Sequence, residues 1–159
     1  MSATPHRASK PAKTRTNSVT LDLPTARHML PLVRSIVAEI VETHKRLGKL
    51  NPEQELLERS RRSLNWVARQ RRYAIQDEIS SAEKAMSGAV TELTALGVKL
   101  TDPEVGQVDF PTKINGRPAA FTWKLGEEAV SFWHYTGEEQ PRPIPADWQP
   151  GTPLRGREV

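Results

Sequence analysis

The dipeptide Asn115-Gly116 constrains the fold of this chain more than any other feature of its sequence. Flanked by alternating apolar residues, it predicts a β-hairpin with a two-residue type I′ turn. Such a turn fixes the register, so Ile114 faces Arg117 and Phe110 faces Phe121. One face is then almost wholly apolar: Val108, Phe110, Ile114, Ala119, Phe121, Trp123 and Leu125. The sequence predicts two strands at about 107–114 and 117–125, joined by this turn.

A third strand is predicted at about 129–135, and its register depends on the length of the preceding loop. A two-residue loop at Gly126-Glu127 places His134 on the apolar face. A three-residue loop reverses the strand, turning Trp133 and Tyr135 inward and bringing His134 to the face that carries Asp109. The sequence leaves both registers open.

Residues 23–96 predict two helices. Asp22 is a suitable N-cap for the first, at about 23–48, and Pro31 must either kink or restart that helix. Gly48 and the step Asn51-Pro52 predict its end and the following turn. The second helix, at about 53–96, ends at Gly97. Its seam changes register between Ile75 and Ile79, and the cleaner half is Ile79, Ala82, Met86, Ala89, Leu93 and Leu96.

The unequal lengths of the two helices predict how they are covered. At 1.5 Å per residue they span roughly 39 Å and roughly 66 Å, and the short loop makes them antiparallel. The first helix then covers about half of the second, and the β segment or a second subunit must cover the rest. The predicted fold is α+β: a long antiparallel helical hairpin capped by a three-stranded antiparallel meander. The second helix is expected to be the longer one, and the sequence leaves open whether it is kinked.

The two ends of the chain differ in composition from the middle. Residues 1–18 are rich in Ser, Thr, Lys and Arg and predict a disordered basic arm. Residues 137–159 contain five prolines and predict an extended tail. We therefore expect a single domain at 19–136. The chain has no cysteine and no apolar run of membrane-spanning length, so we expect a cytoplasmic protein that does not enter a membrane.

An arginine cluster lies at the start of the second predicted helix, close to Trp66 and Tyr73. Basic residues interleaved with aromatic ones are typical of nucleic-acid binding, because arginine contacts phosphate and an aromatic ring stacks on a base. The candidate contacts are Arg59, Arg62, Arg69 and Arg72. These arginines spread around the helix, so the alternative is a solvated surface, and the basic arm has the same two interpretations.

The predicted meander holds a candidate polar site. It comprises Asp109, Arg117, Glu127, His134 and Glu138, with Trp123 and Trp133 as candidate aromatic partners. These are the residue types of a metal or acid–base site, with Asp109 and His134 as candidate metal ligands. The alternative is a set of core and surface residues with local partners. No motif for a cofactor is present, so we expect none.

Several short motifs are shared with a known family. They are Gly106-x-Val108-Asp109-Phe110-Pro111, Gly116-Arg117, Trp123, Leu125-Gly126-Glu127 and Trp133-His134, together with Met29-Leu30-Pro31-Leu32 near the start. Over residues 19–143 the chain resembles the bacterial family named domain of unknown function 2203. The resemblance implies a helical segment followed by a small β region, and it implies no established activity. Family members carry an acidic residue soon after the Trp-His pair, where this chain has Tyr135 and Thr136.

These patterns favour a non-enzymatic interaction or scaffold module. Its helical hairpin, with a coiled-coil-like seam, is the predicted surface for self-association or for a protein partner. A metal- or ligand-binding site at Asp109, Arg117 and His134 is one alternative. Nucleic-acid binding through the basic arm and the stretch Arg59–Arg72 is the other.

Overall fold

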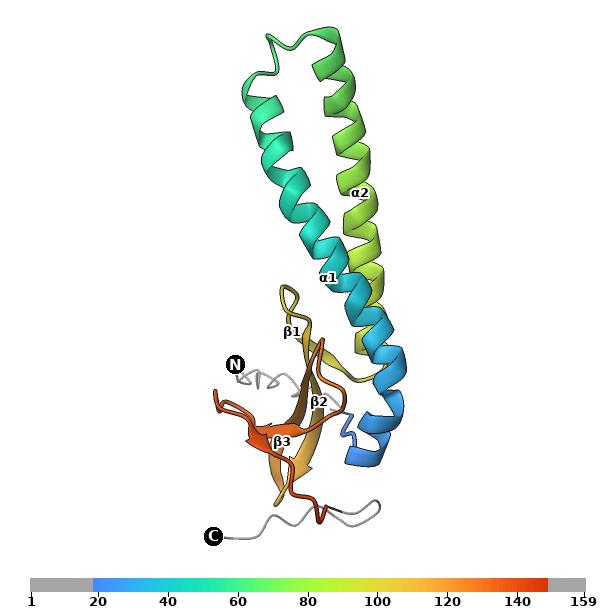
Figure 1. Cartoon of the computed structure of the whole chain (residues 1–159), viewed down its shortest axis with the longest axis vertical. Helices are drawn as coiled ribbons and strands as arrows, with labels where there is room; N and C mark the ends of the chain where they lie inside the picture. The colour runs from blue at the N-terminus through green and yellow to red at the C-terminus, as the bar shows by residue number, and fades with distance from the viewer. Residues whose placement is uncertain (1–18, 149–159) are drawn as a thin grey trace, which may run out of the picture.

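Two long helices are followed by an antiparallel sheet in this computed structural model, which describes residues 19–148 (Figure 1). Helix α1 is Leu23–Arg59 and helix α2 is Trp66–Ala95. The strands are β1 (Lys99–Asp102), β2 (Gln107–Ile114), β3 (Arg117–Lys124), β4 (Phe132–Tyr135) and β5 (Arg142–Pro143). The strands lie in the order β1-β2-β3-β4-β5, each antiparallel to the next. The predicted α+β class is confirmed.

Helix α1 is longer than predicted and α2 is shorter. Gly48 and Pro52 lie inside α1, so the predicted helix end at Gly48 and the predicted turn at Pro52 are both wrong. Leu50 is buried in a small cluster with Ile75 and Ile79, and this packing continues α1 past both residues. Helix α1 therefore has 37 residues and α2 has 30, so the prediction that the second helix is longer is also wrong.

The polar segment between the helices supplies the turn, at residues 60–65. Asn65 is the N-cap of α2, because its side-chain Oδ1 accepts a hydrogen bond from the Ala68 N–H at 2.8 Å. Asp22 caps α1 as predicted, accepting from the Thr25 N–H at 2.8 Å. At the other end of α2, Gly97 has φ +80° and the chain turns there into β1. The Asp22 cap was predicted, whereas the Asn65 cap was not, because the second helix was expected to begin near residue 53.

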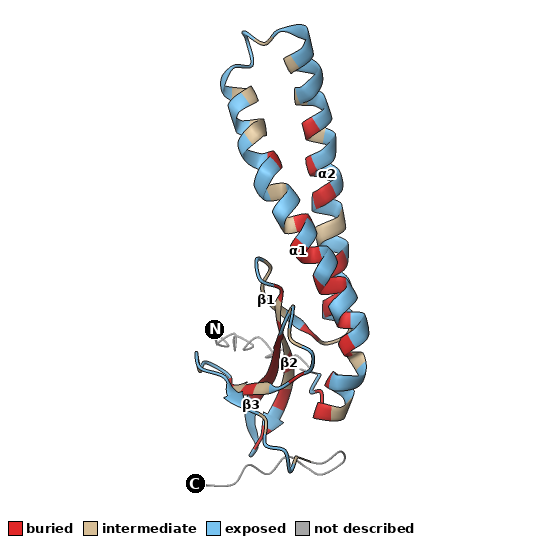
Figure 2. Cartoon of the chain, viewed as in Figure 1, coloured by how far each residue is buried: buried red, intermediate tan, exposed pale blue. Residues whose placement is uncertain are grey.

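The main hydrophobic core lies where the base of the helical hairpin meets the sheet (Figure 2). The sheet packs against the N-terminal half of α1 and the C-terminal end of α2. The fully or almost fully buried residues from these elements include Val33, Val37, Ile40, Leu93, Val108, Phe110, Ile114, Phe121 and Trp123. The N-terminal part of α1 extends past the C-terminal end of α2 (Figure 1), and the sheet covers this part of α1. The predicted overhang on α2 is wrong: its apolar stripe, including Ala82 and Ala89, is buried within the monomer.

The hairpin register is as predicted. Ile114 pairs with Arg117 and Phe110 with Phe121, and Asn115 and Gly116 both have positive φ, at 55° and 71°. These two angles are what a type I′ turn requires. Pro111 sits where β1 no longer pairs with β2, and its carbonyl accepts from the Leu21 N–H at 2.7 Å.

Strand β4 adopts the register in which Trp133 and Tyr135 point into the core. Trp133 pairs with Phe121, and Tyr135 pairs with Ala119. The strand begins at Phe132 rather than near residue 129. The sheet has five strands rather than three, because β1 and β5 extend it on both sides. Within the predicted tail, Ile144 and Trp148 pack against the core, and the predicted basic arm lies outside the described residues.

Candidate functional site

Asp109 and His134 come together on the face of the sheet that is turned away from the helices. His134 Nε2 lies 3.2 Å from Asp109 Oδ2, and only 17% and 15% of the two side chains are exposed. Asp109 stands on β2 and His134 on β4, so the pair reaches diagonally across β3 over the small side chain of Ala120. The sequence identified both residues but left their shared face undecided.

The surroundings of this pair limit its chemistry. His134 Nδ1 lies 2.9 Å from the Tyr135 carbonyl oxygen, which can only accept a hydrogen bond. Both ring nitrogens are therefore engaged with oxygens, and neither has a lone pair directed at open space for removing a proton from a substrate. Asp109 Oδ1 is buried and has no hydrogen-bond partner among residues 19–148. The pair therefore links β4 to β2 through one contact and leaves the Asp109 Oδ1 atom unsatisfied within the described region.

The other three candidate residues do not join this pair. Arg117 lies at the hairpin turn with its Cζ 4.0 Å from the centroid of the Tyr135 ring, on the opposite face. Glu138 accepts from Arg142 at 2.7 Å. Glu127 lies in the loop after β3, where its carbonyl oxygen accepts from Trp123 Nε1 at 3.0 Å. Arg117, Glu127 and Glu138 thus lie apart from the pair, and within residues 19–148 no group of three His, Asp or Glu side chains is arranged to hold a metal ion.

The two candidate aromatic partners belong to the core. Trp123 is fully buried beneath α1, where the Cζ of Arg34 lies 5.9 Å from its ring centroid. Trp133 packs edge-on against Tyr135 with centroids 5.0 Å apart, and its centroid lies 5.4 Å from that of Trp148. The Cζ of Arg142 lies over the Trp133 ring, 5.0 Å from its centroid. Sequence reasoning missed this aromatic and arginine cluster, because it forms only when β5 folds back beside β4.

A shallow depression beside this core was also not anticipated. It has a volume of about 590 Å³ and is lined by Arg34, Leu125, Gly126, Glu127 and Glu128. Arg34 donates to the Glu128 carbonyl oxygen at 2.9 Å, and Glu127 Oε2 is buried with no hydrogen-bond partner in the region that the structure describes. Arg34 comes from α1, 94 positions before Glu128, so no sequence pattern connects it with the loop.

The second candidate region is the hairpin tip, which we define as residues 56–73. Three of its arginines are held by glutamates: Arg59 by Glu55 at 2.7 Å, Arg71 by Glu53 at 2.8 Å and Arg72 by Glu58 at 2.6 Å. The hydrogen bond from Arg71 lowers the pKa of Glu53 below its ordinary value. Arg72 is only 14% exposed, so it serves the hairpin itself and is not free for phosphate. Arg61, Arg62 and Arg69 are exposed and form no ion pair with any carboxylate that the structure describes.

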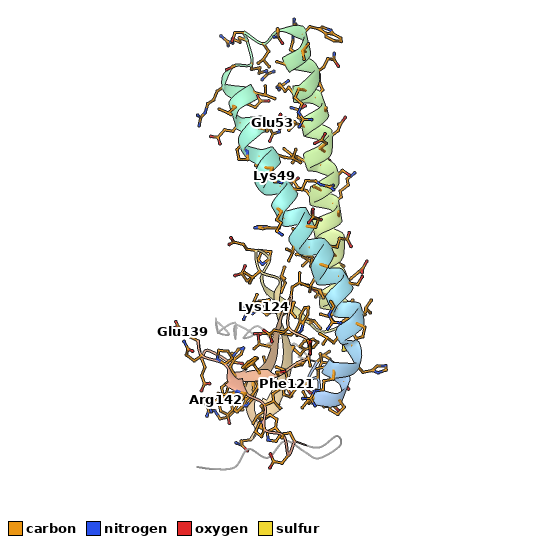
Figure 3. All side chains as sticks on the ribbon, viewed as in Figure 1. Lys49, Glu53, Phe121, Lys124, Glu139 and Arg142 are labelled. Carbon is orange, nitrogen blue, oxygen red and sulfur yellow. The ribbon has the colours of Figure 1, made fainter. Side chains whose placement is uncertain are left out.

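Large apolar side chains are exposed at the same end of the molecule. Leu56 is 63% exposed, Trp66 68%, Val67 70% and Tyr73 58%. Figure 3 places Glu53 high on the hairpin, far from Phe121 and Arg142 at the sheet. The hairpin tip and the Asp109–His134 pair are thus two separate regions at opposite ends.

Fold and sites together define a small α+β protein in which a helical hairpin projects from a five-stranded antiparallel meander. The chain belongs to the family described as "Uncharacterized conserved protein (DUF2203)", whose model matches residues 20–140. Neither a curated protein nor a solved structure matches this chain. The helices of the described region, residues 19–148, include none with the length and apolar character to cross a membrane.

Proposed function

We propose that this protein is an interaction module in which the sheet and the hairpin base form a rigid body and the hairpin tip binds a protein partner. The single observation that carries this proposal is the clustering of exposed apolar side chains. Of the seven large hydrophobic residues that are exposed in the described chain, four lie in the hairpin tip: Leu56, Trp66, Val67 and Tyr73. Such clusters mark interaction sites.

The kinds of residue at the tip support the same proposal. Tryptophan, tyrosine and arginine are enriched among the residues that dominate binding energy at protein interfaces. The tip combines Trp66 and Tyr73 with Arg61, Arg62 and Arg69, which form no ion pair within the described part of the chain. It also stands clear of the sheet (Figure 1), so a partner can approach it without contacting the base.

The Asp109–His134 pair fits a structural role within this proposal. It ties β4 to β2 and so helps to keep the sheet rigid beneath the hairpin. Since both nitrogens of His134 are engaged, the pair offers a substrate no free base. Of the two regions, the tip is the better candidate for partner binding.

Peptide display provides a direct test. A random peptide library is selected against the whole protein, and the enriched peptides are then tested on Trp66→Ala/Tyr73→Ala. Since neither side chain belongs to a buried cluster, this variant keeps its fold, which circular dichroism checks. We expect enriched peptides that bind the natural protein and lose most of their affinity for the variant. Peptides that bind both proteins equally would place the interaction surface elsewhere.

A matched control comes from the opposite end of α1. Leu32 is 53% exposed and lies near the helix base, outside the hairpin tip. Leu32→Ala removes a comparable exposed side chain and should leave peptide affinity unchanged. If this substitution weakened binding as much as the tip variant, the proposed location of the surface would be wrong.

A further inference from the structure

One face of the first turns of α2 carries an exposed stripe of aromatic and basic residues. Trp66, Arg69, Gln70 and Tyr73 follow the spacing i, i+3, i+4, i+7, which places them on one side of the helix, and all four are exposed. Ile75, half a helical rotation away from this stripe, is fully buried against α1. The stripe is thus the outward face of the hairpin tip.

We propose that this stripe binds an acidic, amphipathic helical segment of a partner protein, an inference that rests on the proposed function of the hairpin tip. The length of the stripe supports a helical partner. From Trp66 to Tyr73 it extends roughly 10 Å, or two helical turns. An amphipathic helix presents apolar anchors at the same i, i+3, i+4, i+7 spacing and would pack alongside α2 as a third helix.

The positive charge of the hairpin tip indicates that the partner is negatively charged. Between residues 53 and 72 the chain has six arginines and three glutamates, and each of these glutamates is bound to an arginine. Arg61, Arg62 and Arg69 remain without an ion pair to any described carboxylate. The first turn of α2 contains no acidic residue, so the positive end of its helix dipole is not offset there. Glutamates flanking the apolar face of a partner helix complement these charges.

Two other occupants fit the same surface less well. A second copy of this chain would place Arg69 and its neighbouring arginines against the same arginines of the other copy. Repulsion between these like charges disfavours such a dimer. Single-stranded nucleic acid would stack bases on Trp66 and Tyr73, but Leu56 and Val67 offer no ring for stacking. The three arginines that have no ion pair within residues 19–148 also neutralise few phosphates, whereas strong nucleic-acid binding uses more.

The test uses three synthetic helices of about a dozen residues that share one leucine face and differ along its edges. The edges carry glutamate, glutamine or lysine, and binding to the full chain is followed by fluorescence anisotropy at moderate salt. We expect the glutamate peptide to bind about tenfold or more tightly than the glutamine peptide. The lysine peptide should not bind. Equal affinity for the glutamate and glutamine peptides would overturn the inference.

Charge reversal at the tip provides the matched comparison. We expect the variant Arg61→Glu/Arg62→Glu/Arg69→Glu to lose binding of the glutamate peptide and to gain binding of the lysine peptide. The control is Lys45→Glu/Arg46→Glu/Lys49→Glu, which changes net charge equally at exposed positions midway along α1. It should leave both affinities unchanged. Equal effects of the two variants would show a general charge effect and no specific stripe.

The outcomes separate this inference from the proposed function. Peptide display could select peptides whose binding depends on Trp66 and Tyr73 but which contain no acidic residues. The tip would then be a partner site, and the inference of an acidic helical partner would be wrong. If a labelled oligo-uridine binds the tip and the peptides do not, the partner is nucleic acid and both are wrong. A dimer seen by light scattering that dissociates in Trp66→Ala/Tyr73→Ala would likewise replace the acidic partner with a second copy.

Discussion

The carboxylate of Asp109 has one oxygen bound to His134 and one oxygen buried without a partner among the described residues. An unpaired buried carboxylate is costly, because the charge has lost its water and gained nothing in exchange. His134 therefore stabilises the sheet chiefly by keeping Asp109 from being wholly unpaired. The small side chain of Ala120 makes the diagonal contact across β3 sterically accessible.

This arrangement predicts a non-additive pair of substitutions. His134→Ala should lower the free energy of unfolding by about 3 kcal/mol, since it strands the Asp109 charge. Asp109→Ala/His134→Ala should cost less than that single substitution, because no charge remains buried. Urea unfolding followed by tryptophan fluorescence measures both. A double variant less stable than His134→Ala would show that the pair is not a tie of this kind.

Asp22 gives a prediction with a pH dependence. Hydrogen bonds from the Thr25 hydroxyl and then from its backbone N–H hold the pKa of Asp22 below its ordinary value of 3.8. A carboxyl whose pKa is lower in the folded state stabilises the fold above its unfolded pKa, and this contribution is lost as pH falls through the folded pKa. Asp22→Ala should cost about 1 kcal/mol at neutral pH.

The measurement is thermal or urea unfolding of both proteins between neutral pH and about pH 3. The stability difference between natural protein and Asp22→Ala should stay constant down to about pH 4 and narrow below it. Asp22→Asn serves as the control, because asparagine caps a helix without an ionisable group. A difference that widens in acid would contradict the capping role.

At the level of elements, Gly106 allows the loop before β2 to lie close against α1. Gly106, just before β2, has φ +73°, and a Cβ built there would meet Val37 Cγ1 at 2.7 Å and Val41 Cγ2 at 2.9 Å. Gly116 has a similar φ of +71° but open space around it. The two glycines therefore separate the cost of backbone strain from the cost of a clash.

Gly106→Ala should destabilise the protein by about 3 kcal/mol, from strain and overpacking together. Gly116→Ala, which carries strain alone, should cost about 1 kcal/mol. Both are measured by chemical denaturation under the same conditions. Equal losses in the two variants would mean that α1 does not pack against this loop as described.

The elements also show what sequence patterns can and cannot predict. The hairpin register was predictable because Asn115 and Gly116 act locally, and the N-cap at Asp22 was predictable for the same reason. The end of α1 was not, because Gly48 and Pro52 are helix breakers only when nothing packs beside them. Burial of Leu50 against Ile75 and Ile79 is a tertiary contact that overrides the local preference.

The candidate site was predicted in the same partial way. Asp109 and His134 could be named from residue type, but their meeting required the register of β4, which depends on the loop after β3. Arg34 and Arg142 could not be connected with the sheet, since their contacts depend on how α1 and β5 pack. Trp66 and Tyr73 were noted as neighbours of the arginines, and their shared exposed face followed only once α2 was known to begin at Trp66.

At the scale of the whole molecule, burial is uneven along the hairpin. The base shares the large core with the sheet, whereas the distal half is held by the small cluster of Leu50, Ile75 and Ile79 and by exposed ion pairs. Exposed ion pairs contribute little and are screened by salt. The distal half should therefore open locally more often than the base.

Hydrogen exchange measured by mass spectrometry tests this difference. We expect amides at 30–41 and 86–93 to exchange slowly and those at 50–59 and 66–75 to exchange faster. The difference between the two exchange rates should increase at high salt. Acidic peptide bound to the tip should slow exchange at 66–75 and leave the base unchanged. Uniform protection along both helices would contradict the division of the hairpin into a firm base and a looser tip.

Site-specific photo-crosslinking tests whether the outward face of the hairpin tip binds a partner. A photoreactive amino acid replaces either Gln70, between Trp66 and Tyr73, or Lys84, which is exposed on the same face of α2 further from the tip. With the glutamate peptide present, we predict crosslinks from position 70, none from position 84, and loss of those at 70 in Trp66→Ala/Tyr73→Ala. Crosslinks of equal yield from both positions, or from position 84 alone, would contradict it.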